Sequence, residues 1–247
     1  MTAIGAGADG YRRLLGLGAV DAKSYAGRLA FLRSLRERGA DGVVCATSDA
    51  HEGLGRAVGE VFPGAAWQRC VVRLMGNAAP LAPTRRERAA ALAILHAGFA
   101  ERDPGLVRGL YRLACREICG FRPKAAGLLE EAEADALACL DFPYARRRRP
   151  RASNVRERAN RELKRRSRVV QVLPSGKSLI RMPGAVFSEM DEGRAAGRRF
   201  TEESIAQALA PARPTAPAPA YGGTAEEHAR RIIDVVIADD PIGRKAA

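Results

Sequence analysis

Short apolar runs and longer amphipathic segments alternate in the N-terminal quarter of the chain, and this alternation is typical of a mixed α/β fold. Residues 1–17 predict two short strands joined at "GADG", because an Asp-Gly turn between apolar runs is a hairpin signal. Residues 22–38 have apolar side chains at helical spacing, and Gly39 is placed to end that helix. Val43–Thr47 has the pattern of a buried strand, followed by a polar turn and a helix through about Phe62. This order of strands and helices predicts an α/β sheet.

The middle of the chain, residues 71–145, has an almost wholly helical pattern that is rich in alanine and leucine. Prolines interrupt this pattern at four positions, which are Pro80, Pro83, Pro104 and Pro123. Because proline cannot continue a helix from its interior, each of them marks a break between helices. We therefore expect a helical subdomain here.

A basic connection, "YARRRRPRASN", follows the helical stretch, and Ser153 or Asn154 is a natural N-cap for the helix that carries Glu157. After residue 200 the composition changes to "ALAPARPTAPAPAYGG", which predicts a proline and alanine linker that cannot build a core. The final segment, "AEEHARRIIDVVIADD", is amphipathic and could form a helix of its own.

Positive charge dominates the composition, since 41 Lys and Arg residues against 28 Asp and Glu residues give a formal net charge of +13. An excess of this size favours a polyanionic partner, either nucleic acid or an acidic membrane surface. The sequence has no long apolar run and no secretory signal, so we expect a soluble, cytoplasmic protein without a membrane span. The five cysteines are an odd number without a CxxC pair, which argues against a disulfide framework and a ribbon-type zinc site.

Asp49 is the first candidate for a functional carboxylate, because it follows the apolar run of the predicted strand at the point where the chain leaves the sheet. In α/β proteins, ligands usually bind in the crevice beyond the carboxyl ends of the strands. The alternative interpretation is that Asp49 caps the helix that follows, as aspartates often do. Taken alone, the residue leaves both interpretations open.

Glu157 is the second candidate, because Glu157, Asn160 and Lys164 would line one face of a helix over two turns. A carboxylate and a lysine on one stripe could bind a divalent metal and contact a phosphate. The alternative is a solvated helix face with ion pairs. The surrounding arginines favour the first interpretation, because they could neutralise phosphates around the same place; they are Arg146 to Arg149, Arg158, Arg161, Arg165, Arg166 and Arg168.

Three motifs, "TSDAHEGLGRAVGEVFPGAAWQRC", "SNVRERANRELKRRSRVVQVLP" and "GRRF" near residue 200, resemble those of the Mutator-type transposases of bacterial insertion sequences. The resemblance extends over about residues 3–206. It implies a ribonuclease H-like core, interrupted by a helical insertion, with an Asp, Asp, Glu triad that uses Mg²⁺. By this resemblance Asp49 matches the second aspartate and Glu157 the catalytic glutamate, so both are expected metal ligands. Lys164 matches the basic residue seven positions after Glu157.

The resemblance also gives an expected organisation. Residues 1–70 form the N-terminal part of the ribonuclease H-like core, 71–145 the helical insertion, 146–206 the C-terminal part of the core, and 207–247 a linker and tail. The expected partner is DNA, both transposon ends and target, with a further copy of the chain or a full-length transposase as an additional partner. The expected DNA-binding residues are Arg158, Asn160, Arg161, Lys164, Arg165 and Arg166.

The sequence departs from the family at several positions. The family's first aspartate lies on a strand upstream of the segment that begins this chain, and neither Asp9 nor Asp21 corresponds to it. The family's cysteine followed by histidine appears here as Cys70 and Arg73, and Gly193 replaces an expected tryptophan. We therefore expect an incomplete core in a truncated, catalytically impaired copy of a metal-dependent DNA transposase. The alternative is a non-catalytic DNA-binding fragment that associates with full-length transposase.

Overall fold

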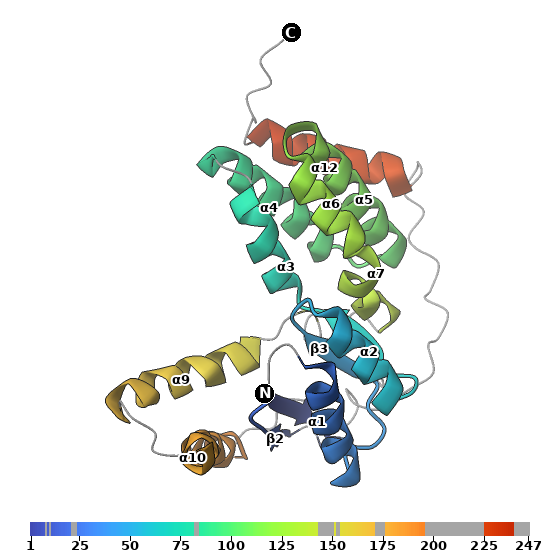
Figure 1. Cartoon of the computed structure of the whole chain (residues 1–247). Coiled ribbons are helices and arrows are strands. Elements are labelled where there is room, and N and C mark those ends of the chain that lie inside the picture. The colour runs from blue at the N-terminus through green and yellow to red at the C-terminus, as the bar shows by residue number, and fades with distance from the viewer. Residues whose placement is uncertain are drawn as a thin grey trace. The chain divides into compact units, whose positions relative to one another are not determined.

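A computed structural model of the chain describes residues 1–7, 9, 11–20, 24–81, 84–142, 151, 154–170, 176–195 and 225–239. The described part is a mixed α/β protein, mostly helical, with four short strands (Figure 1). The chain divides into two compact units, each made of two stretches of sequence. We call Met1–Trp67 with Ser153–Pro211 the mixed unit, and Gln68–Ala152 with Ala212–Ala247 the helical unit.

The mixed unit begins with the predicted hairpin. Strands β1 (Thr2–Ala6) and β2 (Arg12–Leu17) pair antiparallel, with an irregular register near the middle of β1. In the connection, the Asp9 carboxylate accepts a hydrogen bond of 3.0 Å from the backbone N–H of Tyr11 and forms an ion pair of 2.5 Å with Arg13. An aspartate that bonds the backbone two residues on is a common way to fix a turn, so the expected hairpin is confirmed.

Helix α1 (Tyr25–Glu37) follows the hairpin and has clear signals at both ends. At its start, the side chain of Ser24 accepts a hydrogen bond of 3.0 Å from the backbone N–H of Gly27, which satisfies one of the free donors of the first turn. At its end, Gly39 has a φ of +93°, a conformation that favours glycine. The predicted stop at Gly39 is confirmed.

Two further strands flank helix α2 (Glu52–Val61), and these are β3 (Cys45–Ser48) and β4 (Ala66–Arg69). Strand β3 begins two residues later than predicted, and Gly42, three residues before its start, has a φ of +64°. Among the described residues, β1–β2 and β3–β4 form two separate two-stranded sheets in place of the single sheet that we expected. The ribonuclease H-like arrangement therefore stays a prediction.

Helices α1 and α2 pack against each other to form the core of the mixed unit. Their contact buries apolar side chains at helical spacing, as the pattern in the sequence predicted. The buried members of this core are Phe31, Leu32, Leu35, Ala57, Val58, Val61 and Phe62.

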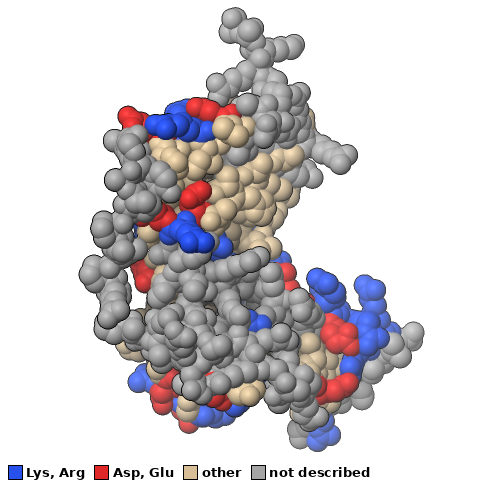
Figure 2. All heavy atoms as spheres, turned by 180° about the vertical axis from the view of Figure 1, so that it is seen from behind, with Lys and Arg blue, Asp and Glu red and all other residues tan. Residues whose placement is uncertain are grey.

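Helices α9 (Asn154–Val170) and α10 (Gly176–Ala195) complete the mixed unit. Helix α9 packs on β1, while α10 packs on β2 and on α9, and Phe187 of α10 is almost fully buried. Figure 2 shows Lys and Arg side chains gathered together with acidic side chains at these helices. Ser153, one of the two predicted caps of α9, lies outside the described residues, and Asn154 is the first residue of the helix.

The helical unit confirms the predicted helical stretch. Two prolines stand at the first turn of a helix, where the missing N–H costs nothing, since Pro104 begins α5 and Pro123 begins α6. No described helix is long and apolar enough to cross a membrane. The helices are α3 (Val71–Ala78), η1 (Ala79–Leu81), α4 (Arg85–Ala100), α5 (Pro104–Phe121), α6 (Pro123–Glu131), α7 (Glu133–Ala136) and η2 (Ala138–Asp141).

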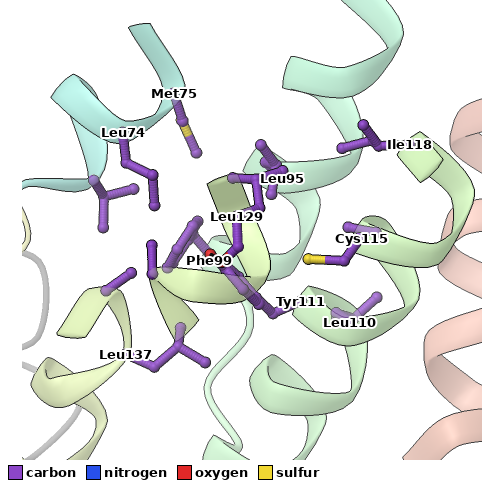
Figure 3. Packing of buried hydrophobic residues seen from close by; sticks show 14 of the residues in the cluster. Leu74, Met75, Leu95, Phe99, Leu110, Tyr111, Cys115, Ile118, Leu129 and Leu137 are labelled. Atoms are coloured by element: carbon purple, nitrogen blue, oxygen red, sulfur yellow. Dashed lines mark hydrogen bonds between the residues drawn. The ribbon is translucent and has the colours of Figure 1, made fainter. Parts of the chain in front are cut away.

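Leucine, alanine and aromatic side chains from these helices form the larger of the two cores (Figure 3). The Tyr111 hydroxyl lies inside this core and donates a hydrogen bond of 2.6 Å to the carbonyl oxygen of Leu129. Burial in this apolar surrounding raises the pKa of the Tyr111 hydroxyl above its ordinary value. Gln68 is also fully buried; its amide donates to the Ala136 carbonyl at 2.8 Å and accepts from the Cys139 N–H at 2.6 Å.

None of the five cysteines forms a disulfide bond in the structure, and three of them, Cys70, Cys115 and Cys139, are buried. Burial raises the pKa of the Cys115 thiol to about 12, with nearby Glu130 and Glu133 adding to the effect. A thiol with so high a pKa stays protonated at neutral pH and is neither a good nucleophile nor a good metal ligand.

The final amphipathic segment is a helix, α12 (Ala225–Asp239), and it packs on α4 and α5 of the helical unit. Ala229 is fully buried at this contact, and Ile232 packs against the core. The Arg230 guanidinium lies 2.9 Å from the largely buried carboxylate of Glu117 on α5. The tail therefore contributes to a core, which the composition alone did not predict.

We predict that Ala229→Glu destabilises the helical unit by roughly 2–4 kcal/mol, because it places a larger, charged side chain in a fully buried position. Val235→Glu on the same helix is the matched control, since the Val235 side chain is 61% exposed. Thermal unfolding followed by circular dichroism measures both changes. Equal effects of the two substitutions would contradict the packing of α12 described above.

Candidate active site and nucleic-acid interface

Asp49 lies directly after the last residue of β3 and belongs to the mixed unit. The N-cap of α2 is His51, not Asp49, so the helix-cap interpretation of Asp49 does not hold. The Asp49 side chain is half-buried, and its Oδ1 atom is fully buried. Because ligands of α/β proteins often bind beyond the carboxyl ends of strands, this position keeps Asp49 a candidate ligand.

Ser48 and Trp67 hold the backbone at this position. The indole Nε1–H of Trp67 donates a hydrogen bond of 2.8 Å to the Ser48 hydroxyl, which in turn donates one of 2.9 Å to the carbonyl oxygen of Asp49. The Ser48 side chain is buried, so these two bonds are protected from water. We did not predict either residue from the sequence, although Trp67 is the single tryptophan of the chain and stands in the same motif as Asp49.

His51 is exposed, and its side chain makes no capping hydrogen bond to α2. Cys70 and Arg73, the pair that replaces the family's cysteine and histidine, lie in the helical unit, Cys70 as the N-cap of α3 and Arg73 within that helix. Cys70 is buried, whereas Arg73 is exposed.

Glu157 lies in the first turn of α9, where the helix dipole favours a negative charge. At about 100° per residue, Arg161 and Lys164 fall on the same face of the helix as Glu157, one and two turns further on. Glu157 and Asn160 are half-buried, while Arg161, Lys164 and Arg168 are exposed. We call Glu157, Asn160, Arg161, Lys164 and Arg168 the open stripe.

A second group of charges lies on another face of α9. Glu162 accepts hydrogen bonds of 2.9 and 2.7 Å from Arg165 and one of 2.8 Å from Arg166. Arg166 also donates two hydrogen bonds to Glu189 on α10, one of them at 3.1 Å. We call Glu162, Arg165, Arg166 and Glu189 the clamp, because it joins α9 to α10.

The clamp has consequences for the charges of its members. Hydrogen bonds from Arg165, and then from Arg166, lower the pKa of the Glu162 carboxyl to about 2. Hydrogen bonds from Arg166 lower the pKa of the Glu189 carboxyl as well. All four groups are therefore charged at neutral pH, and the two arginines are largely neutralised by their partners.

Five of the six predicted DNA-binding residues are thus divided between two faces. Arg161 and Lys164 belong to the open stripe and are exposed, and Asn160 lies half-buried beside them. Arg165 and Arg166 belong to the clamp, although the Arg165 side chain keeps 68% of its surface exposed. The side chain of Arg158 lies outside the described part of the chain, as do Arg146 to Arg149.

Oxygen ligands of the kind that Mg²⁺ prefers are present, since Asp49 and Glu157 both belong to the mixed unit. Among the described residues, however, no group of three or more His, Cys, Asp and Glu side chains is arranged to hold a metal ion. The described residues therefore do not by themselves fit the three-carboxylate site that the family resemblance implies.

The mixed unit thus presents exposed Arg161 and Lys164 side chains on the same helix face as the half-buried Glu157, and clustered basic side chains of this kind favour a polyanionic partner. The family model described as "Transposase, Mutator family" matches residues 1–196. The chain belongs to the Mutator family of transposases.

Curated relatives agree with this assignment. The chain is 37% identical over 200 residues to the transposase for insertion sequence element IS1081 of Mycobacterium tuberculosis, which covers 81% of this chain and 48% of that protein. It is 35% identical to the transposase for insertion sequence element IS406 of Burkholderia multivorans, and that alignment covers 81% of this chain and 52% of that protein. It is 31% identical to the transposase for insertion sequence element ISRM5 of Rhizobium meliloti, and that alignment covers 81% of this chain and 50% of that protein. The chain therefore spans about half the length of these relatives.

We predict that Arg165→Met raises the pKa of the Glu162 carboxyl from about 2 toward its ordinary value of 4.5. Because the folded-state pKa is depressed, the contribution of Glu162 to stability is present above about pH 4.5 and is lost as the pH falls through about 2. Carboxyl ¹³C NMR titration measures the change. Arg161→Met, on the open stripe, is the control and should leave this pKa unchanged.

Proposed function

We propose that the chain carries a DNA-binding and metal-binding part of an insertion-sequence transposase that cleaves and joins DNA strands. The observation that supports this most is the open stripe, in which exposed Arg161 and Lys164 follow Glu157 along one face of α9. A carboxylate in that position would repel a phosphate backbone unless cations surrounded it. The family assignment makes DNA the polyanion that fits.

The roles of the residues follow from their positions. Asp49 and Glu157 are the proposed ligands of Mg²⁺, within a ribonuclease H-like core, and Mg²⁺ supplies the charge neutralisation that phosphoryl transfer requires. Arg161 and Lys164 bind phosphate oxygens and hold the DNA backbone against α9. The clamp links α9 to α10, so that Arg161 and Lys164 approach the DNA from a helix that is held in place.

We further propose that this 247-residue polypeptide binds DNA but is impaired in cleavage. Asp49 and Glu157 are the two candidate carboxylates among the described residues. A site for two metal ions would need a third carboxylate from a separate element. A polypeptide that supplies the third carboxylate would restore the site.

A second candidate function is that of a non-catalytic subunit that associates with full-length transposase. Each described strand pairs with a single other strand, in two separate sheets, so strand edges are left that another chain could extend. Co-expression with a full-length Mutator-family transposase, followed by affinity purification, tests this candidate. A chain that remains a monomer in the presence of that partner would count against it.

We predict that the 247-residue chain binds duplex DNA with a steep salt dependence. Arg161→Ala and Lys164→Ala should each weaken binding and reduce the slope of log K against log salt by about 0.9, the contribution of one phosphate contact. Fluorescence anisotropy with a labelled duplex measures both quantities.

The control for these substitutions is Arg33→Ala, which removes the same charge from α1, where Arg33 forms an ion pair with Glu60. It should leave the slope unchanged within about 0.3, because Arg33 lies outside the proposed contact. Equal slopes for all three variants would show that the open stripe makes no specific contact with the backbone.

We also predict that the purified chain does not nick supercoiled plasmid DNA in the presence of Mg²⁺ above the level of an Asp49→Ala variant. The reason is that the described residues contain no group of three carboxylates arranged to hold a metal ion. Gel electrophoresis of the plasmid measures nicking. Cleavage that depends on Mg²⁺ and disappears in Asp49→Ala would overturn the proposed impairment, while supporting the assignment of Asp49 as a ligand.

A further inference from the structure

We propose that Trp67 is a positioning residue for Asp49, and that it acts through the Ser48 hydroxyl. The inference rests on the proposed function, because it concerns the carboxylate assigned there to metal binding. It adds two residues, Trp67 and Ser48, whose side chains do not reach the metal or the DNA in this proposal. Their role is to fix the backbone on which Asp49 stands.

The hydrogen bonds give the direction of this effect. Trp67 lies on β4, and its indole N–H can only donate, so the Ser48 hydroxyl must accept at that bond. The hydroxyl hydrogen of Ser48 is then directed to the carbonyl oxygen of Asp49, 2.9 Å away. Each bond thus determines the orientation of the next, and the peptide after Asp49 is held by a side chain from a different strand.

Packing keeps the indole ring in place. An added Cβ at Gly55 of α2 would lie 2.6 to 2.9 Å from three carbon atoms of the Trp67 ring, so only glycine allows this approach. The ring also packs against the apolar core between α1 and α2. Helix α2 begins three residues after Asp49. The Trp67 ring, which is on β4, therefore contacts the helix that follows the end of β3.

These contacts bear on the position of the Asp49 carboxylate. A metal ligand must be held within about 0.5 Å of its working position, and this depends on the residues behind it. The Asp49 Oδ1 atom is already buried, which restricts the side chain from one side. The Ser48 hydroxyl, which is oriented by Trp67, in addition holds the backbone carbonyl of Asp49.

A pair of glycine substitutions tests the packing of the Trp67 ring against Gly55. Gly55→Ala and Gly59→Ala both lie in α2 and gain the same helix propensity, but an added Cβ at Gly59 meets no atom within 4 Å. Since Trp67 is the only tryptophan of the chain, its emission and its single indole N–H resonance report on this position. We expect Gly55→Ala to shift both signals and Gly59→Ala to leave them unchanged.

The hydrogen bonds are tested separately. Ser48→Ala should increase solvent exchange of the indole N–H by about fivefold or more, the effect of losing one hydrogen bond, while Ser48→Thr retains the hydroxyl and should preserve the protection. Trp67→Phe keeps an aromatic ring but removes the donor. In Ser48→Ala and Trp67→Phe, the backbone amide resonances of Asp49 and Ala50 should shift or broaden, whereas Ser48→Thr should resemble the wild type.

The positioning role of Trp67 and the proposed DNA contact can fail independently. Unchanged Asp49 and Ala50 resonances in Trp67→Phe, in a chain that remains folded by circular dichroism, would overturn the positioning role whatever the chain does with DNA. If the resonances change as expected but Arg161→Ala has no effect on DNA binding, the positioning role stands and the proposed DNA contact fails. If Gly55→Ala unfolds the chain, the comparison of Ser48→Ala with Ser48→Thr still tests the positioning role of Trp67.

Discussion

The packing of α9 and α10 on the β1–β2 hairpin is the constraint on which the candidate site depends. It brings a segment from the second half of the chain into the same compact unit as Asp49, although the helical unit lies between them in sequence. Glu157 then stands in the first turn of a helix that is held by the sheet on one side and by α10 on another. A functional carboxylate placed on such a helix is supported by regular structure, which is more precise than a loop.

Charge separation along α9 explains why the sequence surrounds carboxylates with so many cations. Glu162 and Glu189 occupy the guanidinium groups of Arg165 and Arg166, so part of the positive charge is used to join two helices. In the proposed function, the exposed cations of the open stripe bind the DNA backbone. One arginine-rich helix would then serve both folding and binding, because the repeat of 3.6 residues per turn places the clamp and the open stripe on different faces.

Local signals predicted the local structure well. The Asp-Gly turn predicted the β1–β2 hairpin, Gly39 the end of α1, and Pro104 and Pro123 breaks between helices, which the structure places at the starts of α5 and α6. What could not be read from sequence depends on contacts between distant residues: the separation of the strands into two sheets, the hydrogen bond between Trp67 and Ser48, and the packing of α12. The spacing of Glu162 and Arg166 did contain the signal of the clamp, since residues four apart meet on a helix.

In the proposed function, Asp49 and Glu157 bind the same metal ion within the mixed unit. Carboxyl ¹³C NMR of the two side chains during a titration with Mn²⁺, a paramagnetic substitute for Mg²⁺, is the measurement that would decide this. We expect both carboxyl resonances to broaden over the same range of Mn²⁺ concentration, and Asp49→Asn to weaken the broadening at Glu157. Broadening of only one resonance, or independent titration of the two, would contradict it.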